Sequence, residues 1–274
     1  MFFAKLKSIY STLTYSETKV ADYILANRQE PMEEITSSEL AALLGVSQST
    51  IIRFSQKMGY KCFKNMILDL SRSWEENEIE EIQLKDSTAA TNDKIKNHFF
   101  NVINIATDMN DPTLIDEAVN AIYQASHVLC FGYLGTSAMA LHINWMLTEM
   151  GILSYCSEDP LSILTRLRCC PKDSLLIVFS KSGETNAVVN IARTAQKYGV
   201  KTLGITNMAK SSLSPYLDIW LKTMYSATKT RFLSYTELSS HLYLIDVLIL
   251  NLYKKDFSRF KHAVSTYQEI SRLK

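Results

Sequence analysis

The chain has no marked excess of either charge, since its 274 residues give a formal net charge of +1 at pH 7. A chain-wide polycation is therefore excluded, and any contact with nucleic acid must come from a local patch. Long apolar runs are also missing, and none approaches the roughly 18 residues that a membrane-spanning helix needs. The first eight residues lack the basic-then-apolar order of a secretory signal. We therefore expect a cytoplasmic protein without membrane contact.

Cysteine is scarce. Five are present, an odd number without a CxxC pair: Cys62, Cys130, Cys156, Cys169 and Cys170. Neither a disulfide framework nor a zinc site fits that spacing, so reduced thiols, no bound metal and no cofactor are expected. With 47% hydrophobic and 21% charged residues, the composition is that of an ordinary globular protein of one or two domains.

The sharpest local pattern is a short apolar run that ends in a hydroxyl-rich turn. Residues 175–179 (LLIVF) have the continuous apolar character of a strand covered on both faces. Ser180, Ser182 and Thr185 follow around Gly183, and a helix of periodic apolar residues comes next. Such a unit points backbone N–H groups and the positive end of a helix dipole at one place, which suits a phosphate monoester. The alternative is a helix that Ser182 or Thr185 merely caps.

Residues 36–60 have the pattern of two short helices joined by a tight turn. Gly45 stands where the chain must reverse, a place that favours the left-handed conformation open to glycine. Ser37 or Ser38 would cap the first helix, and Ser47 the second. The apolar positions fall on one side of each helix: Leu40, Ala41 and Leu44 on the first, Ile51 and Phe54 on the second. This spacing predicts a helix-turn-helix.

The second of these helices leaves a polar face that suits DNA. Six side chains there can read base edges or hold phosphates: Ser47, Gln48, Ser49, Thr50, Arg53 and Lys57. From Gly45 to Arg72 there are five basic residues against one acid, so positive charge gathers locally. The same helical geometry also occurs in proteins that never touch DNA. Agreement between the turn, the core spacing and the local charge favours a double-stranded DNA operator as partner.

The periodicity divides the chain into two domains. We expect an all-α helix-turn-helix domain over residues 1–77, a linker over 78–93, and an α/β domain over 94–274. In the α/β domain, strand and helix patterns alternate, which predicts a doubly wound, parallel, five-stranded sheet. The expected strands are residues 127–131, 152–156, 174–180, 201–206 and 218–223. Ligands of such sheets bind at the carboxyl ends of the strands, where the loops 132–137 and 180–185 both begin.

Two motifs resemble domains that are known together. The run SKSGET at residues 180–185, after an apolar strand, resembles the signature of the sugar isomerase (SIS) domain, and ITN at 205–207 is similar to the end of that domain's next strand. The stretch from Glu39 to Phe63, with GVSxSTIIRF at its centre, resembles the DNA-binding domain of the RpiR family of bacterial transcriptional regulators. That family joins the two domains in this order, and the resemblance covers nearly the whole chain.

The resemblance implies that Ser180, Ser182 and Thr185 hold a sugar phosphate. The first loop of the domain usually reads Gly-x-Gly-x-Ser, and here Tyr133 stands at the first glycine. Ser137 still matches the family's serine. Tyr133 would narrow the mouth of the pocket or change which sugar fits.

Two functions from different classes remain open. The first is a regulator of sugar-metabolism genes without catalytic residues, in which a sugar-phosphate effector alters DNA affinity. Because helix-turn-helix proteins usually address two half-sites, a homodimer or homotetramer is expected, with Phe99, Phe100 and the closing helices at the interface. The second is an aldose–ketose sugar-phosphate isomerase, which needs a placed general base.

Glu237 and His241 bear on that choice because they stand four residues apart on a predicted helix. They are candidates for the base of an isomerase, or for contacts to sugar hydroxyls without turnover. An ordinary polar pair, exposed or at an interface, is favoured because such pairs are common on helices.

Overall fold

The computed structural model of the chain describes residues 2–27, 35–72, 82–224 and 237–261. These residues form two compact units. The first holds the described residues up to Ile105 together with Met224, and the second holds Ala106 to Thr223 and the described residues from Glu237 on. None of the helices in these ranges combines the length and the apolarity that crossing a bilayer requires.

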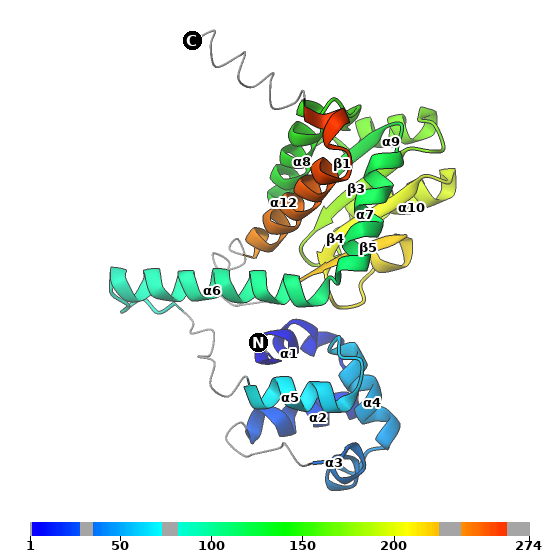
Figure 1. Cartoon of the computed structure of the whole chain (residues 1–274). Coiled ribbons are helices and arrows are strands. Elements are labelled where there is room, and N and C mark those ends of the chain that lie inside the picture. The colour runs from blue at the N-terminus through cyan, green and yellow to red at the C-terminus, as the bar shows by residue number, and fades with distance from the viewer. Residues whose placement is uncertain (1, 28–34, 73–81, 225–236, 262–274) are drawn as a thin grey trace. The chain divides into compact units, whose positions relative to one another are not determined.

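The first unit is helical (Figure 1). Its elements up to residue 72 are α1 (Phe2–Ile9), a 3-10 turn (Tyr10–Thr12), α2 (Tyr15–Ala26), α3 (Ser37–Leu44), α4 (Gln48–Lys57) and α5 (Phe63–Arg72). Buried apolar side chains from all five α-helices form its core: Phe2, Leu6, Val20, Ile24, Leu40, Ile51, Phe54, Met66 and Leu70. Because α4 packs against α2, α3 and α5, its apolar side is held firmly while its polar side faces out.

A long helix, α6 (Thr88–Met109), begins inside the predicted linker. The hydroxyl of Ser87 accepts a hydrogen bond from the amide of Ala90 (3.2 Å), which starts the helix at this point. Lys94 then pairs with Asp86 just before the helix (2.9 Å). Residues 88–93 of the predicted linker are thus helical, while the domain boundaries at 77 and 94 stay a prediction.

The second unit contains a parallel five-stranded sheet in the order β2-β1-β3-β4-β5. The strands are β1 (Val128–Gly132), β2 (Ser154–Cys156), β3 (Leu175–Ser180), β4 (Lys201–Asn207) and β5 (Ile219–Thr223). This confirms the predicted fold class, and every strand lies within two residues of its predicted range. The order reverses direction between β1 and β3, so the carboxyl ends of these two strands flank the crevice where doubly wound sheets bind ligands.

Helices cover both faces of the sheet. On one face lie α7 (Pro112–Gln124), α8 (Ser137–Glu149) and α12 (Leu238–Lys255), and on the other α9 (Pro160–Cys169) and α10 (Asn186–Tyr198). A short 3-10 turn follows β1 (Leu134–Thr136), and another precedes β5 (Ser214–Tyr216). Figure 1 shows α8 and α12 on one side of the strands and α10 on the other.

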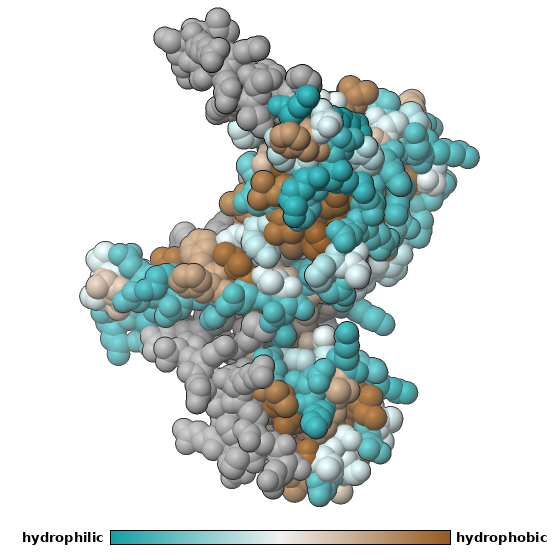
Figure 2. All heavy atoms as spheres, in the orientation of Figure 1, coloured by the Kyte–Doolittle hydropathy of each residue, from teal (hydrophilic) through white to brown (hydrophobic). Residues whose placement is uncertain are grey.

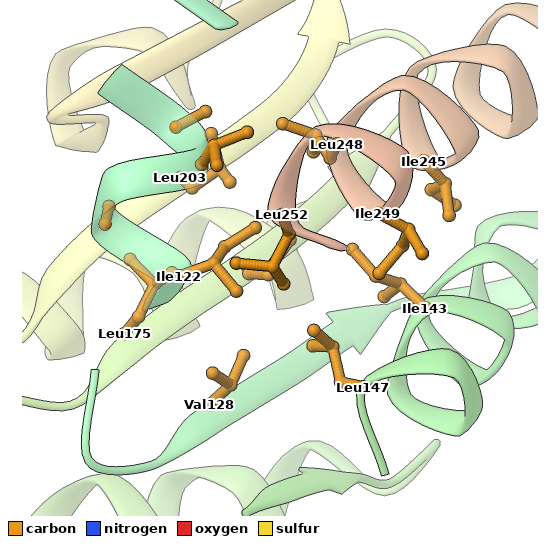
Figure 3. Packing of buried hydrophobic residues seen from close by; sticks show 14 of the residues in the cluster. Ile122, Val128, Ile143, Leu147, Leu175, Leu203, Ile245, Leu248, Ile249 and Leu252 are labelled. Atoms are coloured by element: carbon orange, nitrogen blue, oxygen red, sulfur yellow. The ribbon is translucent and has the colours of Figure 1, made fainter. Parts of the chain in front are cut away.

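The residues of β3 alternate between these two layers. Leu175, Ile177 and Phe179 pack in the cluster with α7, α8 and α12, part of which Figure 3 shows, while Leu176 and Val178 pack against α9 and α10. Burial on both faces explains why the run is apolar throughout.

Candidate functional sites

The first helix of the helix-turn-helix starts one residue earlier than the predicted caps. Thr36, rather than Ser37 or Ser38, is the N-cap of α3, since its hydroxyl accepts from the amide of Glu39 (3.2 Å). The carboxylate of Glu39 accepts in return from the amide of Thr36 (2.8 Å), and this bond lowers the pKa of Glu39. The serine prediction is wrong because a capping box needs the acid three residues after the cap, and only Thr36 meets that spacing.

The turn and the second cap are as predicted. Gly45 ends α3 with φ of 63°, in the left-handed region. Ser47 is the N-cap of α4 and accepts from the amide of Thr50 (3.2 Å). The predicted core residues Ile51 and Phe54 are fully buried. Local geometry therefore orients α4 before any partner is present.

The outward face of α4 carries most of the predicted DNA-contact residues. The hydroxyl of Ser47 lies 2.8 Å from that of Ser49 and 2.9 Å from that of Thr50, so the three form one polar cluster at the start of the helix. The amide of Gln48 donates to the hydroxyl of Ser37 (3.0 Å), which joins the first turns of the two helices. Arg53 is exposed one turn further along.

Gln56 belongs to the same outward face and was missed by sequence reasoning. It is exposed, three residues after Arg53 and four after the exposed Ile52. The signal that could have found it is this helical spacing, because residues three and four apart share a face. Its side-chain amide suits adenine in the major groove.

Lys57 is engaged within the protein. Its ammonium donates to the carbonyl of Thr12 (2.6 Å) and pairs with the carboxylate of Glu17 (2.9 Å). The same carboxylate accepts from the amide of Thr14 (2.8 Å) at the start of α2. Burial pushes the pKa of Glu17 up, but the bonds from Thr14 and Lys57 outweigh it and leave that pKa lowered. Lys57 therefore fastens the end of α4 to the start of α2.

In the second unit, the loop after β3 presents a helix start without a side-chain cap. The buried hydroxyl of Ser180 accepts from the amide of Gly183 (3.0 Å), and that of Ser182 accepts from the amide of Glu184 (3.2 Å). Thr185 is the N-cap residue of α10, yet its side chain makes no capping bond. The alternative of a helix merely capped by Ser182 or Thr185 does not hold, and the first-turn amides of α10 remain available to an anion.

This loop packs closely against the loop after β4 and is hydrogen-bonded to it. Gly183 has φ of 75°, and a Cβ added there would lie 2.2 Å from the hydroxyl oxygen of Ser211. The carbonyl of Gly183 accepts from the amide of Leu213 (3.0 Å). The carboxylate of Glu184 accepts from the amide (3.0 Å) and the hydroxyl (2.6 Å) of Ser212, which turns its charge toward that loop.

Unsatisfied oxygen atoms gather at the same edge of the sheet. Within the described ranges, four side-chain oxygens near the carboxyl ends of β4 and β5 are buried and make no hydrogen bond: those of Thr206, Asn207, Ser211 and Thr223. Buried polar groups are nearly always hydrogen-bonded, so such a group of orphans needs explaining, and a polar ligand would supply partners. Sequence reasoning noticed Thr206 and Asn207 only as part of a motif and missed Ser211 and Thr223, whose signal is their place at or just after strand ends.

Glu237 and His241 are buried side chains at this edge. Both are almost completely inaccessible in the single chain, so the favoured interpretation as an ordinary polar pair, exposed or at an interface, is wrong. The pKa of His241 is lowered to about 4: burial is the main cause and the charge of Lys181 adds to it, while the carbonyls of Glu237, Ser180 and Ile205 offset part of the shift. These neighbours place His241 under the ends of β3 and β4, where it is neutral at pH 7.

The loop after β1 contacts Glu158, a residue that sequence reasoning missed. The hydroxyl of Ser137 lies 2.7 Å from the carbonyl of Leu134 and 3.0 Å from a carboxylate oxygen of Glu158, which follows β2. Leu134 has a backbone φ of 54°, a conformation that residues other than glycine rarely adopt. The amide of Tyr133 donates to the hydroxyl of Thr136 (3.0 Å), which closes the loop despite the altered first glycine position.

Comparison with known proteins agrees with this architecture. Residues 2–77 match the helix-turn-helix domain of the rpiR family, and residues 121–251 match the SIS domain. The chain belongs to the RpiR family. An uncharacterised helix-turn-helix transcriptional regulator of Thermotoga maritima is 26% identical over 275 residues, which is 98% of each chain.

Two solved structures share the fold of this RpiR-family chain. The NanR protein of Vibrio vulnificus, complexed with ManNAc-6P, superposes with a TM-score of 0.62 at 21% identity over 98% of this chain and 97% of that one. The sugar isomerase domain of an RpiR transcription factor from Sphaerobacter thermophilus gives 0.58 at 21% identity over 66% and 98%. In the RpiR-family chain described here, the SIS match includes both hydroxyl-rich loops and His241.

Proposed function

We propose that this chain is a DNA-binding transcriptional regulator of sugar-metabolism genes whose SIS domain binds a phosphorylated sugar effector. The observation that carries the effector half is the joint placement of an uncapped helix start and a group of buried, unsatisfied oxygens at one sheet edge. A dianion at the first turn of α10 is stabilised by the helix dipole and by backbone amides. Neutral sugar hydroxyls fit the remaining polar groups.

In this proposal the two ends of the effector meet different chemistry. Ser180, Ser182 and Thr185 surround the phosphate, while the buried oxygens of Thr206 and Thr223, among others, meet hydroxyls. NanR, a protein of the same fold complexed with ManNAc-6P, supports a phosphorylated sugar as the class of ligand. The neutral ring of His241 and the carboxyl group of Glu237 complete the wall of the site, and Ser137 contributes from the loop after β1.

The DNA-binding half rests on the polar face of α4. Ser47, Gln48, Ser49, Thr50 and Arg53 would contact the duplex directly, with Gln56 beside them. Lys57 would act mainly by holding α4 in place through Glu17, because its ammonium is already engaged.

We infer that no turnover occurs, although an isomerase remains the alternative. A general base works best with a pKa near the working pH. Burial holds the pKa of His241 at about 4, so its neutral ring is a weak base at pH 7. Incubation with the bound sugar phosphate, followed by analysis for the aldose–ketose partner, tests this, and any enzyme-dependent conversion would favour the isomerase.

A homodimer or homotetramer is also part of the proposal. Apolar side chains are exposed on α8 and α12, with Leu141 and Trp145 on the first and Leu242 and Leu250 on the second. Figure 2 shows apolar surface over α12 among more hydrophilic surroundings. A patch of this kind suits an interface between copies, and two DNA-binding domains would then address two half-sites.

The DNA-binding half is tested with the operator selected from random duplexes by the full chain. Arg53→Ala should weaken operator binding by at least about tenfold, since a lost charged contact to a base or phosphate costs about 1–3 kcal/mol. Fluorescence anisotropy measures this. Sugar-phosphate binding of the same variant, followed by thermal shift, should be unchanged. Unaltered DNA affinity would remove α4 as the reading helix.

The effector half is tested by the double variant Ser182→Ala with Thr185→Ala. Operator binding should persist, while the change in DNA affinity on adding sugar phosphate should disappear because the phosphate loses its hydroxyl contacts. The matched control is Ser126→Ala with Thr165→Ala, which removes the same groups elsewhere in this unit, since Ser126 precedes β1 at the amino edge of the sheet and Thr165 is exposed on α9. A response that survives in the first double variant would place the anion site elsewhere.

A further inference from the structure

Glu158 places a negative charge beside one of the proposed effector contacts. Its carboxylate oxygen lies 3.0 Å from the hydroxyl oxygen of Ser137. Glu158 follows the end of β2. Cys156, the last residue of β2, lies opposite Cys130 of β1 in the register of the two parallel strands. The carboxylate therefore stands at the carboxyl edge of the sheet, next to the loop after β1. Burial and then the charge of Glu158 raise the pKa of Cys156 to about 11, which agrees with this position.

The crevice is consequently polarised from one side to the other. Around the loop after β3 lie the positive end of α10 and the ammonium of Lys181, close enough to disfavour protonation of His241. The one carboxylate within that loop, Glu184, is turned to Ser212 and bonded twice. On the β1 side α8 also begins, at Ser137, but there an acid faces the loop. Asp159 is occupied as the N-cap of α9 by the amides of Leu161 and Ser162, which leaves Glu158 as the acid that meets the loop.

The hydrogen-bonding groups of Ser137 and Glu158 also indicate which ligand groups can bind on the β1 side. The hydroxyl of Ser137 has one hydrogen, and it lies between the carbonyl of Leu134 and the carboxylate of Glu158. Its lone pairs, and those of the carboxylate, can only accept further bonds. A ligand group at this place must therefore be a donor, such as a sugar hydroxyl or an ammonium group. A second anion there would meet Coulomb repulsion from the carboxylate of Glu158.

We propose that Glu158 is a specificity-determining residue that restricts the effector to sugar monophosphates with hydroxyl or ammonium groups at the end remote from the phosphate. Sugar bisphosphates and phosphorylated sugar acids are rejected by the charge of Glu158. This inference rests on the proposed sugar-phosphate function and narrows its ligand class.

The test compares pairs of probes that differ in one anionic group. Glucose 6-phosphate is paired with 6-phosphogluconate, and fructose 6-phosphate with fructose 1,6-bisphosphate. Inorganic phosphate reports the anion site alone, and glucosamine 6-phosphate supplies the ammonium group. Dissociation constants are measured by thermal shift and calorimetry on the full chain, on Glu158→Gln, and on Glu149→Gln. Glu149 is the matched control because it is exposed at the opposite end of α8.

In the wild-type protein, the member of each pair whose only anionic group is the single phosphate should bind at least about tenfold more tightly than the partner with a second anionic group. In Glu158→Gln that ratio should shrink about tenfold, because one like charge near the second anionic group is neutralised, while inorganic phosphate binds as before. In Glu149→Gln the ratio should stay at the wild-type value.

Three results would overturn the proposal. Equal or tighter binding of the probes with a second anionic group by the wild-type protein would remove it while leaving the sugar-phosphate function intact. A ratio that shrinks equally in both variants would reduce the effect to net charge. If inorganic phosphate and all the sugar phosphates leave the wild-type protein unchanged, the proposed function itself fails, and this inference falls with it.

Discussion

At the scale of single residues, burial decides what His241 can do. A histidine on a helix surface would titrate near its ordinary pKa of 6.5, whereas burial under the strand ends holds the pKa of this ring at about 4. It can exchange hydrogen bonds with a neutral ligand at pH 7, but it cannot pair as a cation with a phosphate. Its companion Glu237 is buried in the same way.

This burial predicts a pH dependence of stability. The pKa of His241 is lower in the folded than in the unfolded chain, so the unfolded chain takes up the proton first as pH falls below about 6.5. The stability that comes from keeping His241 neutral is therefore fully present above that pH and is lost progressively as pH falls to about 4. Between pH 7 and pH 5 the free energy of unfolding should fall by about 2 kcal/mol more than in His241→Gln. Urea titrations at both pH values measure this, and parallel losses in the two proteins would contradict it.

Lys57, also at the scale of single residues, was predicted to contact DNA, but its ammonium is bonded to Glu17 within the protein. On a helical projection it belongs with Arg53, but Glu17, forty residues earlier, reaches it through the fold. Spacing along one helix predicts which side chains share a face, yet it carries no information about a carboxylate brought from another helix. Arg53 meets no such partner among the interactions found for α4, which is why it is the stronger candidate for a DNA contact.

At the scale of elements, the loop after β3 depends on its glycine. Gly183 combines a left-handed backbone with close contact to Ser211, so Gly183→Ala should lower the free energy of unfolding by more than about 3 kcal/mol, or displace the loop. Either outcome should abolish sugar-phosphate binding in a thermal-shift assay.

Gly199 at the end of α10 provides the control. It also has a positive φ, of 71°, but open space surrounds its missing Cβ. Gly199→Ala should therefore cost only about 1 kcal/mol and leave binding unchanged. Equal effects of the two substitutions would show that backbone conformation alone, and not the packing between the two loops, matters at Gly183.

Elements were the level at which sequence reasoning worked best. The strands, the turn at Gly45 and the cap at Ser47 are confirmed because they follow from local apolar patterns and local hydrogen bonds. α10 starts at Asn186, after the hydroxyl-rich turn. The carboxylate of Glu184 in that turn is held by Ser212 of the next loop.

At the scale of the whole molecule, effector and operator must influence each other equally. If a sugar phosphate alters DNA affinity by a given factor, the operator alters sugar-phosphate affinity by the same factor, typically 5- to 150-fold. Two titrations, each ligand in the presence and absence of saturating amounts of the other, measure both factors. A mismatch between them would mean that a further ligand or a change of assembly had been left out of the scheme.

Assembly gives a second prediction at this scale. Leu250→Lys on α12 should shift the native mass of the protein to that of a smaller species, because a charge would be buried in the proposed interface. Leu161→Lys on α9 is the matched control, since Leu250 is 61% and Leu161 69% exposed and α9 covers the other face of the sheet. Light scattering after gel filtration measures the mass, and equal behaviour of the two variants would exclude α12 from the interface.

The sequence by itself determined what depends on neighbours along the chain: the alternation of strands and helices, the turn at Gly45 and the cap at Ser47 of the DNA-binding motif, and the hydroxyl loop at 180–185. Tertiary structure alone decided what depends on distant partners. It buried Glu237 and His241, turned Lys57 toward Glu17, and set Glu158 against Ser137. The physical reason is that burial and charge pairing are properties of the space around a side chain, and that space is filled by residues far away in sequence.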